Sequence, residues 1–322
     1  MKEHSMTEDF VHVPVLAREV AESFGFSEDA PARLIDGTVG GGGHSALLLR
    51  KFPRLELLGI DRDDAALARA ERTLAFAGSR VALVRGDYSA MAQFAAERGW
   101  ESVDGVLLDI GVSSPQIDRP ERGFSWRNDG PLDMRMDRRS PVTASRLLNT
   151  APEAELERVF RCYGEVPRSR KLAAAVAARR EERPFATTSE FAALCDAVLG
   201  RAKPGKLPSP TLPFQALRIA VNDELGELER GLAEAVRILK PSGRLAVIAF
   251  HSLEDRIVKH FFRREAAECV CPPGLPVCVC GKRASLRIVT AKAVTATGEE
   301  LAVNRRAACA RLRVAEKRKT EI

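Results

Sequence analysis

The chain has 322 residues, of which 45% are hydrophobic and 29% are charged, and this composition is typical of a folded globular protein and excludes a disordered one. A chain of this length can form one large domain or two domains of ordinary size. The formal net charge of +6 is compatible with an anionic partner but does not require one.

The sequence contains no apolar run close to the roughly 20 residues that a membrane-spanning helix needs. The stretch MKEHSMTEDFVHVPVL lacks the basic-then-apolar layout of a signal peptide. We therefore expect a cytoplasmic protein with no membrane partner, in which the seven cysteines are reduced.

The first part of the chain alternates strand-like and helix-like segments. Apolar runs at 32–39, 55–63, 81–89 and 103–114 predict strands, and the segments at 45–52, 64–78 and 91–99 between them predict helices. This alternation predicts an α/β fold with a doubly wound, mostly parallel sheet. Because the crossovers are right-handed, the carboxyl ends of all these strands should meet at one edge.

The alternation stops after Pro115, where a stretch rich in glycine, proline and charge is followed by helical patterns. Capping boxes are predicted from Thr150 to Glu153 and from Thr187 to Glu190. Between them lies the alanine-rich, basic segment RSRKLAAAVAARREE. We predict a core made of 1–116 and 211–322, with an inserted helical substrate-recognition domain at 117–210.

The α/β pattern resumes after the insertion. The segment 214–239 predicts one long helix or two, KPSG a turn, 244–250 a buried strand and 252–266 a helix. The segments 284–294 and 309–317 predict a closing antiparallel pair. The basic residues between 304 and 319 form either a solubilising tail or a phosphate-contacting surface.

Four cysteines cluster in CVCPPGLPVCVC, namely Cys269, Cys271, Cys278 and Cys280. Two Cys-x-Cys pairs could close four thiolates around zinc, although the usual knuckle has two residues between its ligands. Alternatively, the segment is a proline-rich loop whose small thiols pack inward. The sequence leaves both interpretations open.

Four consecutive glycines, Gly40 to Gly43, separate the first predicted strand from its helix. Glycines at this point let a ligand approach backbone N–H groups and the start of the helix. The dinucleotide fingerprint G-x-G-x-x-G fails, because its third glycine would fall at Ser45 or Ala46.

An acid stands at or just after the end of each of the first four predicted strands: Asp36, Asp61, Asp87 and Asp109. Four carboxylates at one edge would repel a pyrophosphate but attract a ligand that carries a sulfonium and an ammonium group. S-adenosylmethionine is such a ligand, and Asp61 is placed to accept from its ribose hydroxyls. Any one of these acids could instead be a helix cap or a turn residue.

Several long motifs occur together in this chain. They are DGTVGGGGHS, GIDRD, LLDIGVSSPQIDRPERGFSWRNDGPLDMRMD, LPFQALRIAVNDEL and SGRLAVIAFHSLEDRIVK. From about His12 onward the chain resembles the bacterial 16S ribosomal RNA cytosine-N4 methyltransferases of the MraW/RsmH type. This resemblance implies a Rossmann-like S-adenosylmethionine-dependent methyltransferase core with an inserted helical domain.

The resemblance also implies a substrate and a set of cofactor contacts. The substrate is a cytidine in the decoding region of the small ribosomal subunit, not DNA; a homodimer is one candidate assembly. The implied cofactor contacts are Gly42, Gly43, His44, Asp61, Tyr88, Asp109 and Gln116.

The residue that removes the proton from the cytosine amine is not fixed by the motifs. Asp109 is the nearest acid by position, and His251 after the late strand is the alternative base. No metal ligand is assigned to this site. Phe124 and Trp126 either stack on the target base or pack within the insertion.

Three other functions remain open on sequence grounds. They are a DNA or small-molecule N-methyltransferase, a dehydrogenase, and a non-enzymatic RNA-binding module. The ring of acids disfavours the last, and the failed dinucleotide fingerprint disfavours the dehydrogenase.

Overall fold

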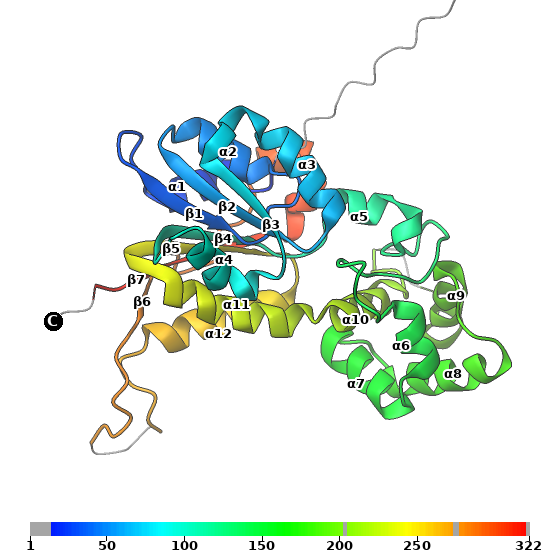
Figure 1. Cartoon of the computed structure of the whole chain (residues 1–322). Helices are drawn as coiled ribbons and strands as arrows, with labels where there is room; N and C mark the ends of the chain where they lie inside the picture. The colour runs from blue at the N-terminus through cyan, green and yellow to red at the C-terminus, as the bar shows by residue number, and fades with distance from the viewer. Residues whose placement is uncertain (1–13, 202–204, 273–276, 320–322) are drawn as a thin grey trace, which may run out of the picture. The chain divides into compact units, whose positions relative to one another are not determined.

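The computed structural model describes residues 14–201, 205–272 and 277–319 (Figure 1). The chain divides into two compact units. The first consists of Met1–Asp61, Ala65–Ile110 and Leu232–Ile322, and the second of Arg62–Asp64 and Gly111–Gly231. None of the described helices is long and apolar enough to span a membrane.

A seven-stranded sheet with the order β3-β2-β1-β4-β5-β7-β6 forms the centre of the first unit. The first five strands are parallel; β7 pairs antiparallel with β5, and β6 pairs antiparallel with β7. The predicted α/β class, its mostly parallel sheet and its closing antiparallel pair are thereby confirmed. The strands are β1 (Ala32–Asp36), β2 (Leu55–Asp61), β3 (Val81–Arg85), β4 (Val103–Asp109), β5 (Leu239–Ala249), β6 (Leu286–Ile288) and β7 (Arg311–Lys317).

Helices cover both faces of this sheet, with α1, α2 and α3 on one face and α4 and α12 on the other (Figure 1). Apolar side chains of the strands and of α1, α2 and α3 form a buried cluster, in which Leu34, Leu48 and Leu57 are fully inaccessible to solvent. The helices of this unit are α1 (Ala17–Ser23), α2 (Gly43–Lys51), α3 (Asp64–Leu74), η1 (Ala75–Arg80), η2 (Tyr88–Ala90), α4 (Met91–Glu97), α12 (Ser252–Ala266), α13 (Gly298–Val303) and η4 (Arg305–Cys309).

The strand order fixes where a ligand can bind. Strands β1 and β4 are neighbours, and the chain leaves β1 toward β2 and β3 on one side and β4 toward β5 on the other. In open parallel sheets, ligands bind beyond the carboxyl ends of the strands at such a reversal of strand order. Asp36, Asp61 and Asp109 end β1, β2 and β4, so they stand at this edge.

The second unit is helical. Its core holds four phenylalanines, Phe160, Phe185, Phe191 and Phe214, in which Phe191 stacks between Phe160 and Phe214 with ring centroids 6.1 and 5.5 Å away. The helices are α5 (Ser114–Asp118), η3 (Pro120–Arg122), α6 (Ala144–Thr150), α7 (Glu153–Gly164), α8 (Ser169–Glu182), α9 (Thr188–Leu199) and α10 (Thr211–Asn222).

The helical unit is longer than the predicted insertion at 117–210. It extends to Gly231 because α10 buries Phe214, Ala216 and Leu217 in the core that it shares with α7. Helix α11 (Glu224–Ile238) then leads back to the sheet. The segment predicted as one helix or two is therefore two, separated at Asp223, whose φ is 47°.

The structure bears on three local predictions. The capping box at Thr187 is confirmed, since its hydroxyl accepts from the Glu190 N–H while the Glu190 carboxylate accepts from the Thr187 N–H. The capping box at Thr150 is wrong, because α6 continues through Thr150 and its hydroxyl donates to the Arg146 carbonyl. The KPSG segment, predicted as a turn, lies within β5, with Ser242 at a φ of 67°.

Candidate active site

The glycine loop joins β1 to α2 by a tight path that larger residues could not follow. Gly42 has a φ of 83° and immediately precedes α2, and its N–H donates to the Val39 carbonyl at 2.8 Å. A Cβ added at Gly37 would lie 2.6 Å from Leu108 Cδ2 and 2.8 Å from Tyr88 Cβ. The loop therefore leaves the backbone N–H groups at the start of α2 uncovered by any acidic or capping side chain of the first turn.

Asp61 lies against this loop. Its Oδ2 accepts from the Gly40 N–H at 2.9 Å, and its backbone carbonyl accepts from the Gly86 N–H at 3.0 Å. The carboxylate is thus held by the loop, and the backbone of Asp61 by the residue that follows β3. This is the position in which an acid on the second strand can reach a ribose bound at the edge of the sheet.

Asp36 has a different role from the one that its place in the sequence predicts. Only 2% exposed, it accepts from Ser45 Oγ at 2.6 Å and from the Thr38 N–H at 3.2 Å. Burial raises the pKa of Asp36 from 3.8 to about 6. The expectation that all four acids face a ligand is therefore wrong for Asp36, whose carboxyl braces the start of α2. Asp87, by contrast, is exposed beyond β3.

His44 and Asp109 form a pair at the same edge. Nε2 of His44 lies 3.6 Å from Oδ2 of Asp109, and the Asp109 N–H donates to Thr38 Oγ1 at 2.6 Å. The His44 side chain is 7% exposed, and neither of its ring nitrogens has a hydrogen-bond partner among the described residues. Oδ1 of Asp109 is likewise buried without a partner in the part of the chain that the structure describes. Buried polar atoms without a partner indicate that a ligand or water forms hydrogen bonds with them.

His251 caps a helix. It precedes α12, and its Nδ1 accepts from the Glu254 N–H at 3.4 Å while the Glu254 carboxylate accepts from the His251 N–H at 3.2 Å. Its Nε2 lies 3.0 Å from Glu254 Oε1. Both nitrogens of the ring thus face the helix start or its buried glutamate.

Tyr88 and Gln116, the remaining predicted cofactor contacts, are both buried. Tyr88 is 6% exposed and begins η2. Gln116 belongs to the second unit, where its amide oxygen accepts from the Ser113 N–H at 2.9 Å and its amide nitrogen donates to Asp63 Oδ2 at 2.9 Å. The structure explains the burial of Gln116 by these two bonds, and its contact with a cofactor stays a prediction.

Asp63 is a residue that sequence reasoning missed. Asp63 is 4% exposed. Its Oδ2 accepts a hydrogen bond from Nη1 of the buried Arg122 at 2.8 Å, in addition to the one from Gln116. Arg122 also donates to the carbonyls of Arg135 and Met136. The motif GIDRD contains Asp63, and PERGF contains Arg122. The sequence therefore shows both charged residues, but only the fold shows that they form an ion pair.

The aromatic and basic residues of the second unit divide into structural and exposed groups. Phe124 and Trp126 pack partly buried against the helical core, which supports the packing alternative for both. Arg180 donates to the carbonyls of Leu148 and Ala151 at 3.0 and 2.7 Å. On the same helix or at its start, Arg168, Arg170 and Lys171 are exposed.

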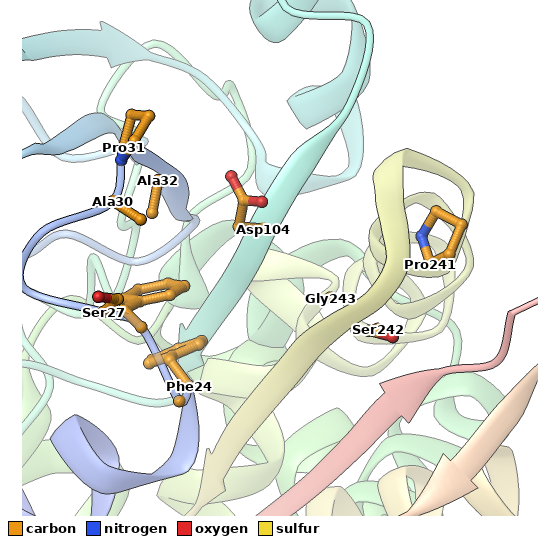
Figure 2. Close-up of a pocket in the computed structure, with 11 residues that line it drawn as sticks. Phe24, Ser27, Ala30, Pro31, Ala32, Asp104, Pro241, Ser242 and Gly243 are labelled. Carbon is orange, nitrogen blue, oxygen red and sulfur yellow. The ribbon is translucent and has the colours of Figure 1, made fainter.

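A pocket at the opposite edge of the sheet is not part of this site. Figure 2 shows that it lies where β1, β4 and β5 begin, with Ala32, Asp104 and Gly243 among its lining residues. The residues at the carboxyl ends of the strands, including Asp61 and Asp109, do not line it. The topology and the unsatisfied polar atoms of His44 and Asp109 locate the candidate site at the other edge.

Comparison with known proteins shows the family to which the chain belongs. A family model described as the MraW methylase family matches residues 9–318. The ribosomal RNA small subunit methyltransferase H of Heliobacterium modesticaldum is 49% identical over 313 residues, which cover 96% of this chain and 99% of that protein. The protein of the same name from Carboxydothermus hydrogenoformans is 47% identical over 310 residues, covering 96% and 98%.

A third relative with this name, from Symbiobacterium thermophilum, is 49% identical over 311 residues, covering 96% of this chain and 97% of that protein. The match to the family model and the identity to these relatives extend over both the sheet core and the helical unit. The chain belongs to the MraW methylase family.

Proposed function

We propose that this protein methylates ribosomal RNA, and that its target is the exocyclic N4 amine of a cytidine in the decoding region of 16S rRNA. Its membership of a methylase family and its 47 to 49% identity to proteins named ribosomal RNA small subunit methyltransferase H support an rRNA methyltransferase. The partner would then be the small ribosomal subunit, and the compartment the cytoplasm. The single observation that carries the proposal is the match of residues 9–318 to this methylase family.

The cofactor is S-adenosylmethionine, as the sequence predicts, and the residues present fit it. Asp61 and the loop of Gly42 and Gly43 would hold the nucleoside part, since a carboxylate beside uncovered N–H groups can accept from ribose hydroxyls. The unsatisfied ring nitrogens of His44 would bind the charged amino-acid part. The cofactor supplies an electrophilic methyl group.

The amine of cytosine is a weak nucleophile because its lone pair is delocalised into the ring. A neighbouring acceptor that orients the N–H groups and takes a proton would raise the rate of attack. Asp109 stands at the end of β4 with Oδ1 unpartnered among the described residues and with a side chain that is 28% exposed. We therefore assign it as the proton acceptor.

The alternative base, His251, is less well suited to this role. Its Nδ1 accepts from the Glu254 N–H at the start of α12, so this nitrogen is occupied by the helix cap. Its Nε2 lies 3.0 Å from Glu254 Oε1 and has no hydrogen-bond partner among the described residues. The contacts of His251 support a capping role.

Substrate binding requires a surface that meets the RNA backbone. The exposed Arg168, Arg170 and Lys171 of the helical unit provide three positive charges in succession around the start of α8. Lys and Arg side chains bind phosphates by displacing counterions, so such binding weakens with salt. The target base must leave its stack to reach a buried site at the edge of a sheet.

Transfer of a labelled methyl group tests the proposal. Purified protein is incubated with labelled S-adenosylmethionine and, separately, with unmethylated small ribosomal subunits, naked 16S rRNA and duplex DNA. We expect label in the 16S rRNA of one of the first two substrates and none in DNA. Labelling of DNA, or of no nucleic acid by a protein that binds the cofactor, would overturn the rRNA assignment.

A further inference from the structure

Four cysteine side chains that the methyl-transfer site does not use meet at one point in the loop between α12 and β6. The Sγ atom of Cys278 lies 3.5 Å from that of Cys269, 3.5 Å from that of Cys280 and 3.9 Å from that of Cys271. The Sγ atoms of Cys269 and Cys280 are 3.8 Å apart. All four sulfur atoms lie within 4.8 Å of one another.

These separations match a single tetrahedral metal ion. Zinc–thiolate bonds of about 2.3 Å at tetrahedral angles place neighbouring sulfurs about 3.8 Å apart. Four of the six separations between the sulfurs, 3.5 to 3.9 Å, bracket this value. An iron–sulfur cluster with bridging sulfides would hold its four thiolates further apart, so the geometry favours one mononuclear ion.

The described residues of the loop provide no buried apolar packing around the cysteines. None of the described residues between 267 and 285 is buried, and Val277 and Val279 beside the cluster are 71% and 77% exposed. Inward packing of the thiols against apolar side chains, the alternative that the sequence left open, finds no support in the described part of this loop. A segment that buries no apolar surface needs a covalent or metal staple to stay ordered, because burial does not offset its conformational entropy.

The base of the loop is fixed by polar contacts. Ser285 donates through its N–H to the Glu265 carbonyl at 2.9 Å and through its Oγ to the Glu265 carboxylate at 2.8 Å. Lys282 Nζ lies 3.4 Å from the same carboxylate, and Arg318 pairs with Glu268. Figure 1 shows the loop extending from the ends of α12 and β6 away from the sheet. The cysteines thus converge beyond an anchored base.

Backbone N–H groups also donate hydrogen bonds to the sulfurs. The Val270 N–H donates to Cys280 Sγ at 3.5 Å, and the Cys271 N–H donates to Cys269 Sγ at 3.4 Å. Both Cys-x-Cys pairs therefore contain a sulfur that accepts from the backbone of the 269–271 segment. Such N–H···S bonds are the outer contacts that stabilise the charge of metal-bound thiolates.

We propose that Cys269, Cys271, Cys278 and Cys280 bind one Zn²⁺ ion as four thiolates. Four protein ligands leave no open position, so the ion is structural and takes no part in methyl transfer. It closes the 267–285 loop at the end remote from Glu265 and Ser285. This inference is independent of the proposed function, because it rests only on the geometry of the loop.

Metal analysis of the whole protein, produced without a polyhistidine tag, tests the proposal. Elemental mass spectrometry should find about one zinc per chain in the wild type and little in Cys278→Ser, which removes the sulfur closest to the other three. The matched control is Cys309→Ser, an exposed cysteine outside the cluster, which should retain the zinc. Zn²⁺ is replaced by Co²⁺ in a parallel sample, which should show the visible absorption of a tetrahedral tetrathiolate site.

Two further measurements use the wild-type protein, so a variant that fails to fold does not decide the outcome. A strong chelator should expose four additional reactive thiols and accelerate tryptic cleavage after Lys282 and Arg283. Wild-type protein without zinc, whose cluster thiols react as fast as that of Cys309, would overturn the proposal. Iron in place of zinc, or disulfides within the cluster in freshly prepared protein, would overturn it as well.

Discussion

Nε2 of His44 lies 3.6 Å from Oδ2 of Asp109, which joins the first turn of α2 to the end of β4. Both side chains have buried polar atoms without a hydrogen-bond partner among the described residues. The strand order puts this pair at the reversal between β1 and β4, where open α/β sheets bind their ligands. The pair is therefore the centre of the proposed site.

Replacement of Asp109 tests its role as the proton acceptor. Asp109→Asn keeps the shape of the side chain but accepts a proton poorly, so kcat should fall by about 100-fold or more. His251→Asn, which keeps a good helix cap, should change kcat by less than about threefold. Single-turnover methylation with saturating cofactor measures both; a large loss in His251→Asn alone would reverse the assignment.

Replacement of Asp61 tests the cofactor site. Asp61→Ala removes the partner of the Gly40 N–H and the acceptor for the ribose, so S-adenosylmethionine should bind about 2–4 kcal/mol more weakly. Asp61→Asn retains one oxygen and should lie between the alanine variant and the wild type. Calorimetric titration gives the affinities, and circular dichroism checks folding. A folded alanine variant with near-native affinity would exclude Asp61 as a ribose contact.

The pH dependence of stability tests the burial of Asp36. Because its pKa is raised to about 6 in the folded protein, from 3.8, the folded state binds this proton more tightly than the unfolded state does. The resulting contribution to stability is complete below about pH 3.8 and is lost as the pH rises through 6.

Asp36→Asn cannot ionise and should remove this dependence. Between pH 4 and pH 8, the free energy of unfolding of the wild type should fall relative to that of the variant by about 2–3 kcal/mol. Urea unfolding at several pH values measures the difference, with Asp29→Asn, a change at an exposed acid, as the control. Parallel pH profiles for the wild type and Asp36→Asn would show that the carboxyl is not buried in solution.

Replacement of the exposed basic residues around the start of α8 tests the RNA surface. Arg168→Ala, Arg170→Ala and Lys171→Ala together should raise the KM for the RNA substrate about tenfold or more and flatten its salt dependence. Arg180 is left intact because it bonds the carbonyls of Leu148 and Ala151. Cofactor affinity should not change.

The matched control replaces three exposed basic residues of the first unit, Arg50, Lys51 and Arg72, by alanine. Equal losses in the two triple variants would show that net charge alone attracts the RNA. Wild-type kinetics in the α8 variant would instead direct attention to the basic C-terminal segment.

The sheet could be predicted from the sequence because the apolar runs of its strands alternate with helices of regular length. The role of Asp36 could not, because it depends on the Ser45 hydroxyl turning back toward the end of β1. The compact helical unit extends beyond the predicted insertion for a similar reason. The apolar residues of α10, such as Phe214 and Leu217, have the same pattern whichever core receives them.

Some site residues could also be predicted from local sequence, whereas others depend on contacts that only the fold creates. The glycine loop and Asp61 were visible as a motif, since their spacing is local in the chain. The contacts of Asp63 with Gln116 and Arg122 join residues more than 50 positions apart, and no spacing rule reveals them. The cysteine cluster could be predicted in part. The two Cys-x-Cys pairs suggested zinc, but only the fold showed that the four sulfurs lie together.

The identity of the methylated atom tests the central claim most directly. Unmethylated small ribosomal subunits are treated with the protein and S-adenosylmethionine, and the 16S rRNA is then digested to nucleosides and to fragments for mass analysis. We predict one additional methyl group on the N4 of a cytidine in the decoding region, absent when Asp109→Asn replaces the wild type. A methyl group on a ring carbon, on a ribose oxygen or on another base would contradict the account.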